Sequence, residues 1–580
     1  MAVLTARGAE RPRTARTAER LPAMLAGLAT LACAAIFALL GTIVWLSFVR
    51  GTPGDPHVGY TLAHYRAIFL DPFTYRVLAN TLVFSAITLA VSLVLAVPMA
   101  WLVERTDFPG KRVVFTLLTV ALLIPGFSVA LGWLFLLSPR IGLINLALQS
   151  LFGLSDAPFN ISTLPGMGIV QGLSLTPVTF IMTAVVIRSI DPALDEAASM
   201  GGANLGQTLR RVTVPLAWPG VLAASIYVFT IGFAAFDVPA ILGLTNRIFT
   251  FSTYVYLQVS PTDGLPEYGD VAALSVFMVA LAVLFSWWYG RVQARAPRYS
   301  VVTGKGYRPR LVPLGRFRWL AVAFVCAYFV LSELLPVATL VWSAALPFLR
   351  PPGAEAFASL SLGNFRNLPH GLVWNGLRNT AMLMLFVPSI TLAFSLGVSW
   401  VVLRSRLRFR AVFDFFAFLP HTVPTIVFSV AAWLLALFVL RVMYGTVWIL
   451  VLVYVVAMLS YGSRMTNGAL IQIHRELEEA ARVSGAGLGG IVRSVLLPLL
   501  TPAMLYAWIW IALLSYRELT LPVVLSTSGN APLSVVVWSL VLSSSFGRAS
   551  AVAVTMLFLM MPVLAVYWTV ARRTGIAPSS

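Results

Sequence analysis

Four ionisable side chains stand inside long apolar stretches of this 580-residue chain and could do chemistry there: Asp237, His421, Arg517 and Glu518. A charged side chain is costly to bury in hydrocarbon, so these residues are candidates for lining a polar path through a membrane. The alternative is structural. Arg517 and Glu518 would pair with their neighbours, and Asp237 would cap a kinked helix end near the outer surface. A histidine between prolines, as His421 is, more commonly satisfies exposed backbone than binds a metal.

No other pattern in the sequence supports an enzyme or a metal centre. The stretch GKGY at 304–307 lacks the strand and the hydroxyl residue of a phosphate-binding loop, and no nucleophile stands out beside a base. His, Cys and carboxylate residues form no cluster with ligand spacing. We therefore expect that the protein is not an enzyme, holds no metal and binds no cofactor.

The elements that must position these residues are membrane spans. Hydrophobic residues make up 59% of the chain, charged residues 11%, and the mean hydropathy is +0.88. A helix needs about 20 apolar residues to cross a bilayer, whereas a barrel strand needs about ten alternating ones. Long apolar runs predict an all-α polytopic membrane protein with twelve spans. They lie near residues 22–48, 78–103, 113–138, 166–188, 217–242, 269–290, 319–343, 378–402, 412–440, 447–463, 501–525 and 549–570.

One polar sequence segment occurs twice between these apolar runs. Residues 190–220 and 473–503 align without a gap at an offset of 283 and share 14 of 31 positions. A second offset, 299, matches residues around the second and eighth spans: Asn80 with Asn379, Thr81 with Thr380, Trp101 with Trp400, Arg105 with Arg404, and Pro125 with Pro424. The chain therefore reads as two six-helix halves in the same orientation, with a path expected between them.

This repeat divides the chain into five segments. They are a basic N-terminal arm at 1–21, a first six-helix half at 22–290, a basic linker at 291–318, a second half at 319–570 and a tail at 571–580. Because the offset falls from 299 to 283, the first half carries about 16 additional residues in its loop 139–165, which contains an amphipathic piece. We expect that piece either to lie along the outer surface or to fill space between helices.

The net charge of +19 does not indicate a nucleic-acid partner. A nucleic-acid binder should concentrate its basic residues on a soluble domain, and no such domain stands out here. Most of the 40 Lys and Arg residues instead fall on one side of the predicted spans, as the positive-inside rule requires if both termini are cytoplasmic. We expect these residues to contact anionic membrane lipid.

The repeated phrase predicts a short helix, a glycine turn and a second helix that ends at a proline. Gly202 and Gly485 allow a positive φ or a close backbone approach. Pro215 and Pro498 stop or kink the helix that re-enters the membrane. Such a surface, present twice, could transmit a movement of a soluble partner to the membrane spans.

The two phrases resemble the EAA motif of permease subunits of bacterial type I ABC importers. The residues that carry the resemblance are Glu196, Ala197, Ala198, Gly202 and Pro215 in the first half, and Glu479, Ala480, Ala481, Gly485 and Pro498 in the second. The resemblance implies that each motif forms a coupling helix seated on an ATP-binding cassette subunit. ATP would be used by that partner dimer, a periplasmic binding protein would deliver the solute, and the chain would lie in the bacterial inner membrane.

Two motifs in one chain resemble the ferric-iron and thiamine branch of that family. Three segments are similar to segments of ferric-iron permeases: VTGKGYRP (302–309), PHTVPTIV (420–427) and SYRELTLPVVL (515–525). Ferric iron is therefore the expected cargo. Thiamine, polyamine and phosphonate permeases share many of these residues, so their solutes are the alternatives. The rival class is an ion-coupled secondary transporter, which would distribute charges along a central path and would not need two matched loops.

Overall fold

The computed structural model describes residues 14–51, 59–261, 266–293, 311–405 and 407–573. Regular structure in these ranges is helical except for two antiparallel strands of two residues each, β1 (Val49–Arg50) and β2 (Gly59–Tyr60). The predicted arm, linker and tail lie largely outside the described residues. The described end of the linker is tied to the first half, because Val312 N donates to the Arg105 carbonyl (2.9 Å).

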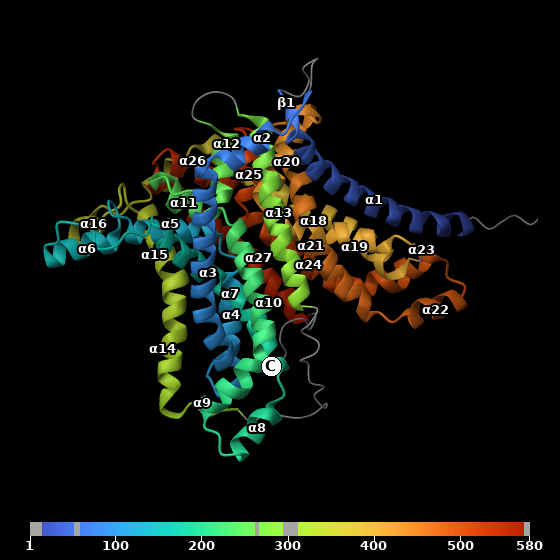
Figure 1. Ribbon diagram of the computed structural model, residues 1–580, viewed down its shortest axis with the longest axis horizontal. Helices are drawn as coiled ribbons and strands as arrows, with labels where there is room; N and C mark the ends of the chain where they lie inside the picture. Colours follow the sequence, from blue (N-terminus) through green and yellow to red (C-terminus); the bar gives the residue numbers. More distant parts are fainter. Residues whose placement is uncertain (1–13, 52–58, 262–265, 294–310, 406, 574–580) are drawn as a thin grey trace, which may run out of the picture.

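In its described residues the first half contains thirteen helices, α1 to α13, seen from blue to green in Figure 1. Their bounds are α1 Thr14–Leu46, α2 Ala63–Leu70, α3 Pro72–Arg105, α4 Lys111–Ala121, α5 Gly126–Leu137, α6 Leu143–Phe152, α7 Leu164–Ser189, α8 Pro192–Met200, α9 Leu205–Thr208, the π turn η1 Leu209–Thr213, α10 Val214–Ala234, α11 Asp237–Gly243, the 3-10 turn η2 Leu244–Asn246, α12 Phe251–Val259 and α13 Tyr268–Gln293.

The second half repeats this order. Its bounds are the 3-10 turn η4 Gly315–Phe317, α14 Arg318–Phe329, the π turn η5 Val330–Leu334, α15 Leu335–Ala344, α16 Ala354–Ala358, α17 Gly363–Arg366, α18 His370–Arg404, α19 Arg410–Thr422, α20 Thr425–Phe438, the 3-10 turn η6 Arg441–Met443, α21 Val447–Gln472, α22 Arg475–Val483, α23 Leu488–Ile491, the π turn η7 Val492–Leu496, α24 Leu497–Arg517, α25 Thr520–Leu525, α26 Leu533–Leu542 and α27 Phe546–Arg573.

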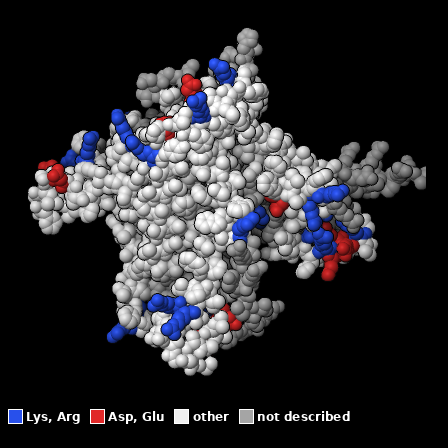
Figure 2. All heavy atoms as spheres, viewed as in Figure 1, with Lys and Arg blue, Asp and Glu red and all other residues white. Residues whose placement is uncertain are grey.

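The number of membrane helices confirms the predicted fold class. In the described ranges, 10 helices are long and apolar enough to cross a bilayer, and two bent pairs bring the number to 12 if each pair is one span. In Figure 2 the broad middle of the molecule carries few charged side chains, which gather instead towards its extremities. The chain is therefore an all-α polytopic membrane protein.

Two predicted spans are sharply bent, so their prediction as continuous helices was wrong. The run 113–138 is α4 and α5, which meet at 93°, and the run 412–440 is α19 and α20, which meet at 105°. Pro125 and Pro424 stand at these breaks. Proline lacks an amide N–H and disfavours a helical conformation in the residue before it, so a break in the helix is favoured at these positions.

The fifth and eleventh spans are also interrupted. The predicted runs 217–242 and 501–525 divide into α10 and α11 and into α24 and α25, with breaks at 235–236 and 518–519. Arg517 is the last residue of α24, and Asp237 is the first of α11. The polar residues therefore stand at helix ends rather than within an unbroken span.

The first helix of each half packs on the other half. The N-terminal α1 lies against α18, α19 and α20, and contacts α13 of its own half. In the second half, α15 lies against α5 and against its own α27, and α14 contacts α3. Figure 1 shows α14 and α15 beside the first half and α1 running out along the second. The two halves are thus interlocked by a reciprocal exchange.

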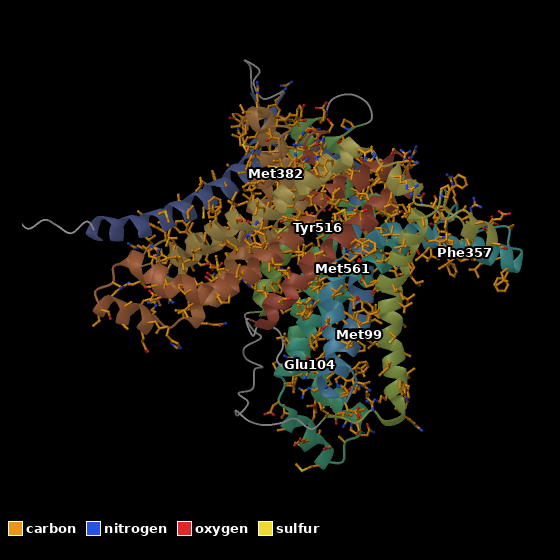
Figure 3. All side chains as sticks on the ribbon, turned by 180° about the vertical axis from the view of Figure 1, so that it is seen from behind. Met99, Glu104, Phe357, Met382, Tyr516 and Met561 are labelled. Atoms are coloured by element: carbon orange, nitrogen blue, oxygen red, sulfur yellow. The ribbon has the colours of Figure 1, made fainter. Side chains whose placement is uncertain are left out.

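Helices α3 and α7 of the first half pack closely against each other. Gly168 and Gly172 stand four residues apart on α7, and a Cβ on either would come within 2.6 Å of a side-chain atom of Ile87 or Val91 on α3. Small residues at this spacing allow helix backbones to approach closely in a membrane. Figure 3 shows α3 from behind, with Met99 along it and Glu104 near its end.

Candidate functional site

If each bent pair is counted as one span, six spans separate the two repeated loops, which places both on the same side of the membrane domain. Each follows the fourth span of its half, α7 or α21, and leads into the fifth. Glu196, Ala197 and Ala198 lie on α8, and Glu479, Ala480 and Ala481 lie on α22. In Figure 1 these two short helices stand apart, α8 at the bottom and α22 at the right. We call this side of the molecule the EAA side.

Each short helix exposes apolar side chains at matched positions. Met200 ends α8 with 85% of its surface exposed, and Val483 ends α22 with 91% exposed. One and a half turns earlier, Leu194 and Leu477 are also exposed. Both pairs are related by the offset of 283. Large apolar side chains that protrude together from a polar loop mark a surface that a partner covers.

Gly202 and Gly485 set the turn after each short helix. Their φ angles are +81° and +85°, and a Cβ on either would meet nothing within 4 Å. The left-handed conformation, and not a close approach, is therefore what these positions require. Of the two uses that the sequence allowed for glycine here, only the first is present.

An arginine fastens the first loop. Arg105, the last residue of α3, donates from Nη2 to the carbonyls of Ile187 (2.8 Å) and Ile190 (2.5 Å) at the end of α7. Its Nη1 also lies 3.6 Å from Oδ2 of Asp195 on α8. The last carbonyls of a helix lack partners within it, so Arg105 both closes α7 and orients α8.

The second loop carries the same fastening. Arg404, the last residue of α18, donates from Nη2 to the carbonyls of Leu470 (3.1 Å) and Ile473 (2.7 Å). Its Nε lies 2.8 Å from Oε1 of Glu478 in an ion pair. Sequence comparison matched Arg105 with Arg404 but assigned them no role. The signal was that an arginine stands just beyond the end of the second predicted span in each half.

Pro215 and Pro498 do not end a helix, so this part of the prediction was wrong. Each is the second residue of a long helix, α10 or α24. That helix begins directly after a π turn, η1 or η7. The helices run without a gap from Leu205 to Ala234 and from Gly489 to Arg517. A π turn lets the backbone continue past a residue that lacks an amide N–H, so the loop is joined to its span as one rod.

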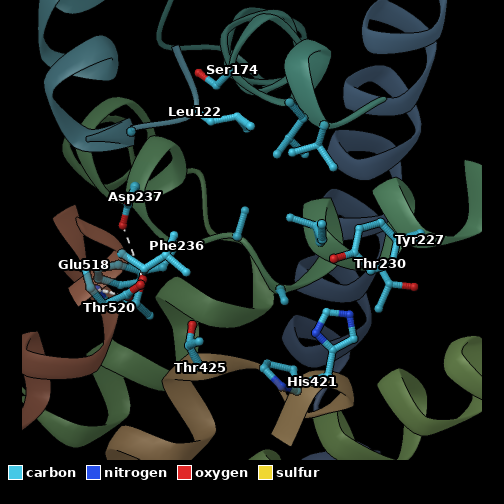
Figure 4. A pocket seen from close by; sticks show the side chains of 18 of the residues that line it. Leu122, Ser174, Tyr227, Thr230, Phe236, Asp237, His421, Thr425, Glu518 and Thr520 are labelled. Atoms are coloured by element: carbon cyan, nitrogen blue, oxygen red, sulfur yellow. Dashed lines mark hydrogen bonds between the residues drawn. The ribbon is translucent and has the colours of Figure 1, made fainter. Parts of the chain in front are cut away.

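A cavity of about 710 Å³ lies between the two halves. Its walls come from α7, α10 and α13 of the first half, from α19, α21 and α24 of the second, and from both proline breaks. All four of the ionisable residues that the sequence singled out line it: Asp237, His421, Arg517 and Glu518. Figure 4 shows Asp237 and Glu518 on one wall and His421 near Tyr227 on the other.

Asp237 and Thr520 meet across the two halves. Thr520 Oγ1 donates to Asp237 Oδ1 at 3.3 Å (dashed in Figure 4). These positions are separated by 283 residues, the offset of the repeat. Two equivalent residues can touch only near the axis that relates the halves, so this bond lies close to the pseudo-twofold axis.

The neighbouring charges are held by backbone groups. Glu518 Oε1 accepts from the amides of Thr520 (3.0 Å) and Leu521 (3.3 Å) and so caps α25. Arg517 donates to the carbonyl of Leu122 at the break of the other half. Glu518 thus bonds to the backbone of its own half and Arg517 to that of the other half, and both residues also line the cavity.

His421 is held by aromatic rings. Its imidazole stacks on Tyr227 of the first half with a centroid distance of 5.3 Å, and also contacts Phe418 and Tyr461. The expected backbone hydrogen bond is not among those of the described residues. Within these ranges no group of three His, Cys, Asp or Glu side chains is arranged to hold a metal ion.

An aromatic cluster covers the end of the cavity away from the EAA side. Trp538 on α26 donates from Nε1 to the hydroxyl of Tyr256 on α12 (3.3 Å), and both rings pack on Phe236. Phe236 and Trp538 are almost fully buried. Because α12 and α26 belong to different halves, this contact closes the interface between them.

The fold and this site are those of a transport permease. The family described as binding-protein-dependent transport system inner membrane component matches residues 92–297 and again 389–576. The chain belongs to this family, as a fused protein with two copies of the permease unit. It is a multi-pass protein of the inner membrane and not an enzyme. Permeases of this family work with an ATPase and a solute-binding protein.

Several curated proteins are similar over both halves. The ferric transport system permease protein FbpB of Actinobacillus pleuropneumoniae is 25% identical over 503 residues, which is 85% of this chain and 70% of the relative. The Fe(3+)-transport system permease protein FbpB 2 of Haemophilus influenzae is 22% identical over 90% of this chain and 96% of its own length. The trehalose transport system permease protein SugB of Mycobacterium tuberculosis is 34% identical over 32% of this chain and 60% of its own.

Proposed function

We propose that this permease imports ferric iron. The observation that carries the proposal is that the relatives matched over 76% to 90% of this chain include three ferric transport permeases. The trehalose permease, although more identical, matches only about a third of the chain. A similarity that runs through both halves and the interface between them bears more on cargo than one confined to a single half. Thiamine, polyamines and phosphonates are the alternative cargoes.

The EAA side is proposed to be cytoplasmic, with an ATP-binding subunit under each loop. Met200 and Val483 would enter a groove of that subunit, flanked by Glu196 and Glu479. With twelve spans, both termini lie on that same side, where most basic residues face anionic lipid. ATP is bound and hydrolysed by the partner dimer, and this chain itself holds no cofactor.

Transport would proceed by alternating access. Closure of the ATPase dimer draws α8 and α22 together, and each loop moves its own half because Arg105 or Arg404 fastens it to the second span of that half. The contacts of Trp538 with Tyr256 and Phe236 then separate, and the cavity opens towards a periplasmic binding protein that delivers the iron. Reversal of the closure returns the cavity to the cytoplasmic side.

The test is ATPase activity of the chain reconstituted with its candidate ATP-binding subunit, with and without a ferric-loaded receptor. Glu196→Ala/Glu479→Ala and Met200→Asp/Val483→Asp should abolish stimulation by the receptor. Leu151→Asp changes a similarly exposed apolar residue on α6, far from the EAA side, and should leave stimulation intact.

Three results would count against the proposal. If Leu151→Asp lost stimulation as completely as the loop variants, the loops would not be the docking sites. If a receptor loaded with another solute stimulated the wild type and the ferric one did not, the cargo would be wrong. If the chain associated with no ATPase, the ion-coupled secondary transporter would be the better explanation.

A further inference from the structure

A fifth ionisable residue, Glu333, faces the cavity from the first span of the second half. It lies on the π turn η5 between α14 and α15, and the sequence reasoning missed it although it stands in the middle of a predicted span. Pro336 follows three residues later, at the start of α15. A π turn inside a membrane helix places a side chain where a regular helix would not, and such turns occur frequently at functional sites.

The carboxylate of Glu333 is incompletely bonded. Its Oε2 atom is buried and has no hydrogen-bond partner among the described residues. A buried polar atom without a partner is destabilising, and more so when it is charged. Such a group calls for an explanation in a ligand or in a changing environment.

The span itself does not need this carboxylate. The equivalent helix of the first half, α1, makes the same exchange onto the opposite half and is one continuous α-helix. Its membrane segment Ala23–Leu46 contains no ionisable side chain except the thiol of Cys33. An apolar helix therefore suffices for the packing, so Glu333 and its π turn are an addition to one half only.

The other charged groups that face the cavity are already engaged. Asp237 accepts from Thr520, Glu518 caps α25, and Arg517 donates to the Leu122 carbonyl. Arg517 is in none of the ion pairs formed by the described residues. With His421 neutral, three carboxylates then face one guanidinium, and the cavity has a net negative formal charge.

We propose that Glu333 is a cargo-contacting residue of the translocation path and that its carboxylate attracts a multivalent metal cation into the cavity. This inference rests on the proposed function and adds a residue to it. A carboxylate in a water-poor cavity acts on a cation far more strongly than one in bulk water. Because no trio of ligands surrounds it in the described ranges, the cation would pass without being trapped.

The experiment measures iron uptake and ATPase activity together, in vesicles that contain the chain, its ATP-binding subunit and a ferric-loaded receptor. Glu333→Gln keeps the size of the side chain and removes its charge, and Glu333→Asp keeps the charge. Glu355→Gln is the matched control, because Glu355 is an exposed carboxylate on α16 of the same half and does not line the cavity. The melting temperature of each variant is measured alongside.

We expect Glu333→Gln to lower uptake by roughly tenfold, equivalent to about 1.4 kcal/mol, while the receptor still stimulates ATPase activity. Glu333→Asp should retain most of the uptake, and Glu355→Gln should match the wild type. Wild-type uptake by Glu333→Gln would overturn the inference and leave the proposed function standing. Equal losses in the Gln and Asp variants with a lowered melting temperature would also overturn it, in favour of a structural role. Absence of iron uptake by the wild type would instead overturn the proposed cargo.

Discussion

Asp195 in the first loop and Glu478 in the second occupy the same place in the repeat and face equivalent arginines, yet their surroundings differ. The Asp195 side chain is 27% exposed, lies 3.6 Å from Arg105 and also accepts from Thr213 Oγ1 (3.2 Å). The Glu478 side chain is 10% exposed and lies 2.8 Å from Arg404. The second ion pair is therefore closer and drier than the first.

The difference extends through both loops. The first is held by hydrogen bonds, because Asp191 caps α8 and Asn204 forms a reciprocal capping box with Gln207. The second is held by an apolar cluster. Leu470, Ile473, Ile491, Leu496 and Leu500 pack together beneath it. Leu496 occupies the position that Thr213 holds in the first half.

The two loops share fewer structural features than their sequences suggest. The glycine with φ above +80°, the arginine across the helix end, the π turn before the proline and the exposed apolar tip occur in both. The interactions that hold these shared features in place differ between the two loops. We infer that the position of the tip is constrained, while the means of holding it is not.

The largest expected effect is in the second ion pair. Arg404→Ala leaves a buried carboxylate unpaired and should lower the free energy of unfolding by about 3–5 kcal/mol. Arg105→Ala should cost about 1–3 kcal/mol, because Asp195 is more exposed and keeps its bond to Thr213. The shift in the denaturant midpoint of the solubilised chain measures both.

Two further variants sharpen this comparison. Adding Glu478→Gln to Arg404→Ala removes the stranded charge and should recover part of the loss, which a double-mutant cycle would quantify. Arg482→Ala changes an exposed arginine on the same helix and should have little effect. Equal losses for Arg404→Ala and Arg105→Ala would contradict the difference in burial.

A smaller effect should distinguish the helix pairs of the two halves. A Cβ on Gly172 would lie 2.6 Å from Val91 Cβ and 2.9 Å from the backbone oxygen of Thr88, neither of which can move easily. A Cβ on Gly462 would chiefly meet the Ser395 hydroxyl, which can rotate away. Gly172→Ala should therefore cost about 1–3 kcal/mol of stability.

Gly462→Ala should change stability by less than about 1 kcal/mol, because the better helix propensity of alanine offsets the remaining crowding. Gly468→Ala, on the same helix α21 with open space around it, is the reference. Melting temperatures of the three solubilised variants make the comparison. A loss at Gly462 as large as at Gly172 would mean that both helix pairs are equally rigid.

The smallest effect should be the same in both halves. Gly202→Ala and Gly485→Ala force a Cβ into a left-handed conformation, which costs about 1–2 kcal/mol each. Because the cost is confined to the turn, we expect faster amide exchange in each loop and weaker coupling of ATPase activity to uptake, with a loss of global stability no larger than that cost. Hydrogen exchange resolves the two loops separately.

The matched controls are Gly206→Ala and Gly489→Ala, which lie at equivalent positions in α9 and α23, where a Cβ is not strained. Asparagine tolerates the left-handed conformation better than alanine, so Gly485→Asn should be milder than Gly485→Ala. An effect in one loop alone would show that the turn is not equally important to both halves.

The class of fold could be predicted from sequence because hydropathy and the repeat are properties of composition and order. The bends at Pro125 and Pro424 could not, although the two prolines were matched, because an apolar run reports that a segment is buried and not the path it takes. The same limit explains why the breaks before Asp237 and after Arg517 were placed inside spans. Prolines at equivalent positions of the two halves, and charged residues in one half or the other beside the breaks, were the signal that these spans are discontinuous.

The cavity was predictable only in part. Asp237 and Thr520 were matched in depth by the repeat, but their contact required the halves to be packed together. Glu333 was readable as a carboxylate in an apolar run and was overlooked. Its side chain reaches the cavity because of the π turn η5 and because α14 and α15 pack on the first half. Neither feature can be recognised from a periodic pattern in the sequence.

The exchange of α1 onto the second half has a consequence for the order of synthesis. Its main partner, α18, begins at His370, so α1 enters the membrane long before that partner exists. At about 5–20 residues per second, the intervening chain takes on the order of 20 to 60 s to make. During that time lipid covers the face of α1 that α18 later takes. The nascent first half therefore cannot reach its final packing until α18 has been made.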